Sequence, residues 1–88
     1  MSWHQVLIRA NDVAQLSATA LIEQFQSAYR AAGAPDGVLV YHAQNTQGDH
    51  VYYFSPQASS VATKLLSQFH ATVCAIEPDL SGSRKVVL

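Results

Sequence analysis

The sequence predicts a single α+β domain whose elements follow the order β-α-β-β-α-β. Two runs rich in β-branched and aromatic residues, 37–43 and 49–54, flank a short polar segment that ends in Gly48, which is typical of a β-hairpin. On either side of the hairpin lie one strand pattern and one amphipathic helix pattern. Two β-α-β units joined in this way form a ferredoxin-like sandwich. In that fold two helices cover one face of an antiparallel sheet with the strand order 4-1-3-2.

Length and composition limit the class of protein. The 88 residues suffice for one domain with one core, so we assign 1–88 to a single unit. With 49% hydrophobic and 12% charged residues, the chain has the balance of a compact globular domain, and so little charge suggests that a partner covers some apolar surface. The net charge of −1 provides no attraction for nucleic acid or for an anionic membrane, and we expect neither as a partner.

The cysteine content and the hydrophobic runs indicate the compartment. The single cysteine, Cys74, excludes an internal disulfide and fits a reducing environment. It lies in an apolar segment, which predicts a buried thiol. No basic-then-apolar leader pattern precedes the first strand, and no apolar run approaches the roughly 20 residues of a membrane helix. We therefore expect a cytoplasmic protein without a membrane segment.

The first strand pattern covers 3–10, and its alternation places Val6 and Ile8 on the same face. The helix that follows has two alternative starts. One is a capping box that begins at Asp12 and uses Gln15, and the other is Ser17 as N-cap, with Leu16 in a hydrophobic staple. The periodicity favours the later start, because the apolar residues then share one side of the helix: Ala18, Leu21, Phe25, Ala28, Tyr29 and Ala32.

The hairpin joins a strand at 38–43 to a strand at 49–54 through the loop 44–48. A shift of one residue in this register reverses which of His42 and His50 faces the core. The sequence leaves the register open, because the length of the loop is uncertain by one residue.

The helix boundaries have clear local signals. Gly33, followed by Pro35, predicts the end of the first helix. Ser55 as N-cap and Pro56 at the first helical position predict the start of the second. Leu65 is expected in the core, because it belongs to an apolar stripe with Leu66 at its edge: Ala58, Val61, Ala62, Leu65 and Phe69.

The last third of the chain predicts a fourth strand at 71–77 and a turn at 78–82. The segment 84–88 ends in Val86-Val87-Leu88, which is unusually apolar for a terminus. We expect it to form a short fifth strand or to dock on another surface.

The histidines are the residues with the most scope for chemistry: His4, His42, His50 and His70. No two of them have the spacing of metal ligands, and no glutamate accompanies them in a recognised pattern, so we expect no metal and no cofactor. His42 and His50 are the candidate acid–base residues, because they become neighbours if the hairpin register allows it. Tyr52 and Arg9 are candidates for orienting a substrate or binding its charge.

Motifs argue against three kinds of binding site. RNA-recognition domains carry a basic-Gly-aromatic-Gly motif on the third strand, whereas the strand here begins at Asp49 and contains no glycine. A regulatory amino-acid-binding module would carry a Pro-Gly turn after the first strand, where this chain has Asn11-Asp12. The segment 82–85, Gly-Ser-Arg-Lys, has too little glycine for a phosphate loop and predicts a solvated turn.

The strands carry apolar residues on both faces, although two helices can cover only one. The face without helices would present either Leu39 and Tyr41 or Val38 and Val40 as an apolar patch. We therefore expect a homodimer that buries this patch and acts as a binding or protein-interaction module, for a protein or a small molecule. The alternative is an enzyme of the dimeric α+β barrel type, with the candidate histidines in a cavity between two sheets.

Overall fold

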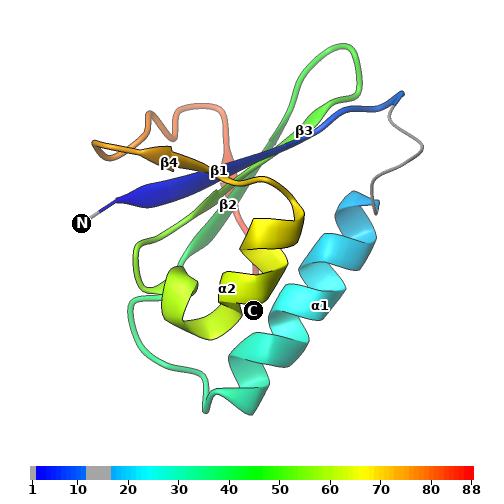
Figure 1. Ribbon diagram of the computed structural model, residues 1–88. Helices are drawn as coiled ribbons and strands as arrows, with labels where there is room; N and C mark the ends of the chain where they lie inside the picture. Colours follow the sequence, from blue (N-terminus) through cyan, green and yellow to red (C-terminus); the bar gives the residue numbers. More distant parts are fainter. Residues whose placement is uncertain (1, 12–16) are drawn as a thin grey trace.

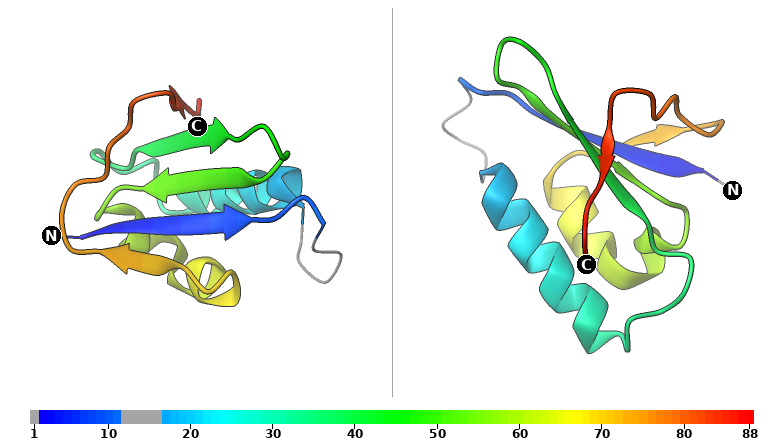
Figure 2. Two further views of the ribbon diagram at one scale, coloured as in Figure 1. Left: turned by 90° about the horizontal axis from the view of Figure 1, so that it is seen from above. Right: turned by 180° about the vertical axis from the view of Figure 1, so that it is seen from behind.

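The computed structural model describes residues 2–11 and 17–88, which form an α+β fold with one sheet and two helices (Figure 1). The sheet order is β4-β1-β3-β2-β5, and every neighbouring pair is antiparallel. Both helices lie on the same face of the sheet (Figure 2). In chain order the elements are β1 (Trp3–Ile8), α1 (Ala18–Ala31), β2 (Val40–Gln44), β3 (His50–Phe54), α2 (Ala58–Gln68), β4 (Thr72–Cys74) and β5 (Arg84–Lys85). Within the described residues, neither helix has the length and apolar character that crossing a membrane requires.

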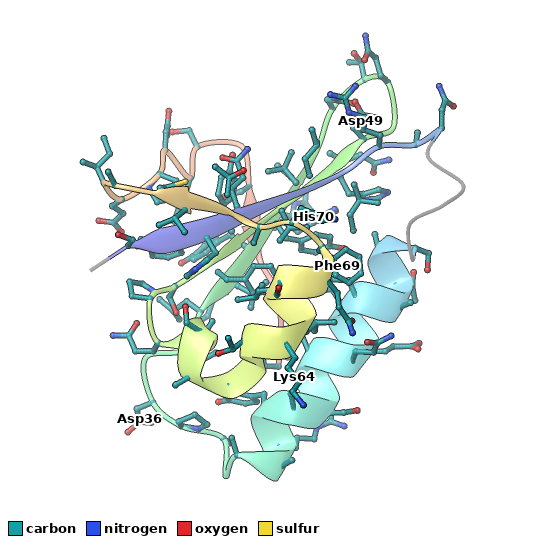
Figure 3. All side chains as sticks on the ribbon, in the orientation of Figure 1. Asp36, Asp49, Lys64, Phe69 and His70 are labelled. Atoms are coloured by element: carbon teal, nitrogen blue, oxygen red, sulfur yellow. The ribbon has the colours of Figure 1, made fainter. Side chains whose placement is uncertain are left out.

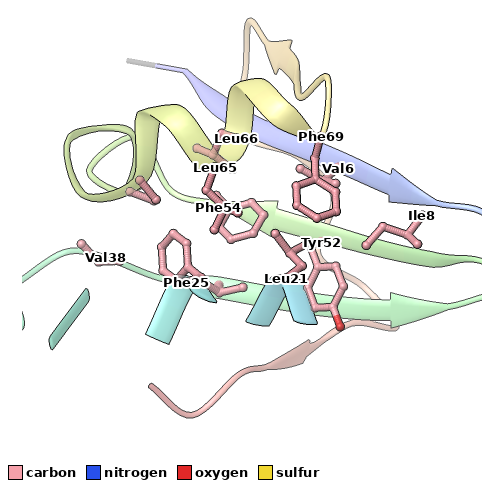
Figure 4. Close-up of a cluster of buried hydrophobic side chains, with 13 residues drawn as sticks. Val6, Ile8, Leu21, Phe25, Val38, Tyr52, Phe54, Leu65, Leu66 and Phe69 are labelled. Carbon is pink, nitrogen blue, oxygen red and sulfur yellow. The ribbon is translucent and has the colours of Figure 1, made fainter. Parts of the chain in front are cut away.

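One cluster of buried side chains fills the space between the helices and the sheet (Figure 4). Phe25 of α1 packs on Phe54 of β3, with ring centroids 4.9 Å apart. Leu65 of α2 belongs to the same cluster, which confirms its predicted core position. The strands contribute alternate residues to the cluster: Val6, Ile8, Val40, Tyr52 and Phe54. The predicted placement of Val6 and Ile8 on the same face of the first strand is therefore confirmed.

Helix α1 starts and ends at local sequence signals. The Oγ of Ser17 accepts a hydrogen bond from the N–H of Ala20, so the later of the two predicted starts is confirmed. The alternative capping box at 12–15 and the staple residue at 16 lie outside the described residues. At the other end Gly33 has φ +85°, and the N–H of Ala34 donates to the carbonyl of Tyr29. This pattern is a Schellman motif, and it confirms the predicted helix end.

Helix α2 starts later than predicted, and Ser55 does not cap it. The helix begins at Ala58, after a turn formed by the two preceding residues. The Oγ of Ser55 accepts from the N–H of Leu39 and donates to the carbonyl of Gly37, both at 2.8 Å. Ser55 is almost fully buried, so its hydroxyl stabilises the segment that enters β2. Pattern reasoning assigned it to the helix because serine before proline has the same local signature in both settings.

Several strand boundaries also differ from the prediction. The second strand covers 40–44 rather than 38–43, and the fourth contains three residues rather than the seven of 71–77. The prediction of a buried Cys74 is wrong, because its side chain is half-buried. The physical reason is that β4 is an edge strand, where one side of the strand has no neighbour to cover it.

The C-terminal residues dock on their own chain. The N–H of Val86 donates to the carbonyl of Val40 at 2.8 Å, which continues the pairing of β5 with β2. The Nε2 of Gln26 in α1 donates to the carbonyl of Val87. Val86 and Leu88 pack against the core cluster. Both predicted roles of this segment are therefore confirmed, since it contains a short strand and then a docked tail.

The face of the sheet away from the helices is only partly open. The register places Val38 and Val40 towards the helices, where both are buried, and leaves Tyr41 on the other face. The connection 75–83 runs from β4 at one edge to β5 at the other, past the start of β1 (Figure 2). Trp3 lies at that end of β1 and is 8% exposed, and its ring is 6.3 Å from that of Tyr41. The apolar patch expected on this face is thus smaller than the sequence pattern suggests.

Candidate functional site

Asn45 sets the hairpin register that the sequence left open. Its Oδ1 accepts from the N–H groups of Gln47 and Asp49, and its Nδ2 donates to the carboxylate of Asp49. Gly48 has φ +86°, which a glycine adopts without strain. The resulting register pairs His42 with Tyr52, so that both candidate histidines share the face that the helices cover.

The structure brings His42, His50 and Tyr52 together. The Nε2 of His42 lies 2.8 Å from the Nδ1 of His50, and the two rings are stacked with centroids 5.0 Å apart. The ring of Tyr52 lies 4.7 Å from that of His42. A hydrogen bond between two imidazoles needs one nitrogen to donate and the other to accept, so the pair shares a single proton at this contact.

The surroundings favour the neutral form of His42. Burial lowers the pKa of His42 below its usual value of 6.5, and the charge that His50 carries when protonated lowers it further. Burial also raises the pKa of the Tyr52 phenol. The pair is therefore a hydrogen-bonded and stacked contact at the border of the core. It lies on the helix side, so a cavity formed between two open sheet faces would not contain it.

Arg9, the fourth candidate, belongs to a different set of contacts. The pKa of Asp49 is lowered first by the hydrogen bond from the N–H of Ala10, then by the Asn45 amide, and to a smaller extent by the charge of Arg9. Sequence reasoning instead missed Arg84, which pairs with His42 across β2 and β5. No local signal could have found this neighbour, because it depends on where the C-terminal strand joins the sheet.

A hollow of about 380 Å³, the α2–β4 groove, lies between α2 and the β4 edge. Two histidines that pattern reasoning set aside, His4 of β1 and His70, line it. The Oγ of Ser59 in α2 lies 3.1 Å from the Nδ1 of His4. The two residues are 55 positions apart, and neither has a motif around it. The pairing follows from the packing of α2 on β1, which no periodicity in the sequence encodes.

Two backbone irregularities lie in or just after α2, and the one at His70 borders this groove. His70 has φ +53° and follows Phe69, the C-cap of α2 (Figure 3). Ala62, inside α2, has φ −141° and ψ 45°, so the helix is kinked there. Thr63 lies next to this kink, and its Oγ1 donates a hydrogen bond to the carbonyl of Ser59.

Two further findings limit the chemistry. Among the described residues, no three histidine, cysteine or acidic side chains gather in a group that could hold a metal ion. A larger hollow of about 480 Å³ between the two helices is lined by side chains such as Gln24 and Lys64, with no histidine among them. The α2–β4 groove is therefore the hollow with more scope for recognition, although it is smaller. Comparison with protein-family models, with curated proteins and with solved structures found no match.

Proposed function

We propose that this chain is a ferredoxin-like association module that forms a homodimer by pairing the outer edges of two β4 strands. The ferredoxin-like assignment is supported by the run β4-β1-β3-β2 within the sheet and by two helices on one face, with β5 added beyond β2. The free thiol of Cys74 suits a reducing compartment such as the cytoplasm.

The observation that carries the proposal is the chemistry of the β4 edge. Val73 is 59% exposed and Ile76, two residues after the strand, is 78% exposed. The segment 71–76 contains no charged residue and no proline. Edge strands of monomers usually carry charges, prolines or bulges that prevent pairing with other chains. An edge that lacks these features is suited to accept another strand.

A second copy of the chain is the partner that this edge fits best. Two identical strands can pair in an antiparallel way about a two-fold axis, because both copies then use the same surface patch. Such pairing requires no partner of a different sequence. The segment carries no charge, so two copies bring no like charges together. The opposite edge is unsuited to this, because Arg84 and Lys85 of two copies would repel each other.

Sedimentation equilibrium at micromolar concentration tests the proposal. The native chain should have the mass of a dimer. Val73→Lys should give a monomer with an unchanged far-UV circular dichroism spectrum, because it places a cation on each edge. Val87→Lys is the matched control, since Val87 is 88% exposed beside the other edge, and it should remain a dimer. A monomer mass for the native chain at every concentration, or a dimer for Val73→Lys, would contradict the proposal.

A further inference from the structure

We propose that the α2–β4 groove binds a small organic anion, such as a carboxylate with an apolar body. The groove belongs to a single chain, and this proposal does not require the dimer. Its volume of about 380 Å³ lies within the range of small-molecule sites, roughly 300–1,000 Å³. Its walls combine imidazole and hydroxyl groups with the apolar side chains of Leu66 and Val73.

The polar groups of the groove favour an anion over a cation. The lining contains the imidazoles of His4 and His70 and the hydroxyl of Ser67, and no acidic side chain. The hydroxyl of Thr63 already donates to the carbonyl of Ser59, and the hydroxyl of Ser59 contacts the Nδ1 of His4. Where Ser59 donates to the Nδ1 of His4, the Nε2 of that ring carries the proton and becomes a donor towards a ligand. Hydroxyl and imidazole donors bind carboxylate oxygens, whereas a cation needs a carboxylate or carbonyl partner.

The backbone at His70 gives a second, independent reason to place a ligand here. His70 occupies the position after the C-cap of α2 in a Schellman motif, in which the N–H of Ala71 donates to the carbonyl of Leu66. The same position in α1 is Gly33, the residue type that adopts a positive φ without strain. A histidine at this position costs stability, and strained side chains of this kind concentrate at ligand sites.

The apolar part of the ligand has a defined place. Leu66 is buried and forms the floor of the groove, while Val73 is exposed on the β4 side. A ring or short alkyl group that lies between them would cover apolar surface of Val73 that is otherwise in water. The expected ligand therefore has its carboxylate near His4 and His70 and its apolar body towards β4.

Benzoate is the probe, and benzylamine, which has the same ring with a cationic group, is the matched control. Titration followed by ¹H–¹⁵N spectra of the histidine rings should show saturable shifts at His4 and His70 with millimolar benzoate and none with benzylamine. His70→Gly keeps the helix end intact, because glycine relieves the positive φ, and it should weaken benzoate binding by about tenfold or more. His50→Gln, a change at a histidine that does not line the groove, should bind benzoate as the native chain does.

Three results would overturn the proposal. The first is the absence of saturable shifts at the two histidines with benzoate. The second is equal binding of benzoate by His70→Gly and the native chain. The third is saturable binding of benzylamine at the same residues. Val73 is left unchanged throughout because it belongs to both the groove and the proposed dimer edge, so a failure of one proposal can be told apart from a failure of the other.

Discussion

The two edges of the sheet differ in what their own chain places beside them. At β5 the strand consists of two cations, Arg84 and Lys85, and the residues that follow dock against α1 and the core. At β4 the strand is uncharged, and Val73 and Ile76 are exposed to solvent. A sheet edge carries unpaired backbone donors and acceptors that any extended strand could bind. The β5 edge is therefore closed by charge and by the chain itself, whereas among the described residues the β4 edge has neither.

The groove strengthens this contrast. The helix that leads into β4 ends at the strained His70, and the α2–β4 groove lies along the same edge. At the β5 side, the corresponding hollow of about 350 Å³ is lined by the docked tail together with Tyr29 and Val38. The features on which the two proposals rest therefore lie on the β4 side of the domain.

Both edges depend on one core, so the largest effect is expected there. Leu65→Ala should lower the free energy of unfolding by about 2–5 kcal/mol, through lost burial and the cavity left behind. Chemical denaturation measures this, and probes at the two edges should unfold together. Lys64→Ala, its exposed neighbour, should change the free energy by no more than about 0.5 kcal/mol. An unchanged midpoint for Leu65→Ala would mean that the buried face of α2 has been wrongly assigned.

Ser55 supports the β2 side of the sheet, and its loss should be the next largest effect. Ser55→Ala removes the partner of the Leu39 N–H and of the Gly37 carbonyl, which should cost about 1–3 kcal/mol. Ser60 is the matched control, because its hydroxyl donates to the Gln57 carbonyl at an exposed position. Ser60→Ala should be close to neutral by thermal denaturation. Equal losses of stability for the two variants would show that the burial of Ser55 does not determine how much its hydrogen bonds stabilise the fold.

The docked tail closes the β5 edge, which substitutions of the neighbouring residues Val86 and Val87 can test. Val86→Asp should destabilise the domain by about 1–2 kcal/mol, because Val86 packs on the core and continues the pairing with β2. Val87→Asp should have almost no effect, since that side chain is 88% exposed. Urea denaturation compares them. If both variants unfold at the native midpoint, the tail does not close this edge in solution.

The backbone strain at His70, just before β4, should be measurable by two substitutions with opposite effects on stability. His70→Gly should raise the free energy of unfolding by about 0.5–1 kcal/mol, because glycine accepts the positive φ without a Cβ clash. Gly33→Ala, the equivalent position of α1, should lower it by a similar amount, since the added Cβ meets nothing within 4 Å and leaves only the backbone strain. Thermal denaturation of the two variants measures these changes. A loss of stability for His70→Gly would show that the backbone at His70 is not strained.

The smallest expected effect is a pH dependence from His42, which pairs with β5. Its pKa in the folded chain lies below the usual 6.5, chiefly because of burial and then because of His50. The unfolded chain therefore binds the proton more readily. The resulting stability is present above about pH 6.5 and is lost as the pH falls through the lowered folded pKa. Urea midpoints across this range should fall less steeply for His42→Gln, and identical slopes would contradict the assignment.

Features that depend on neighbouring residues could be predicted from the sequence alone. Ser17 and Gly33 set the bounds of α1, and the spacing of apolar residues placed Leu65 in the core. Alternation along β1 placed Val6 and Ile8 on the same face, and the structure shows that this face is buried. These predictions succeeded because a cap, a helical stripe and strand alternation are encoded within a few positions of the chain.

Features that depend on which distant segments meet became apparent only in the folded chain. Ser55 has the local signature of a helix cap, yet its partners are Gly37 and Leu39, brought to it by the hairpin. The contact of His4 with Ser59 joins β1 to α2 across 55 positions of the chain, and the two edges differ because the tail returns to β2. Local patterns specify the type of each element and its buried face, whereas edges and grooves arise from long-range pairing, for which the chain carries no short-range signal.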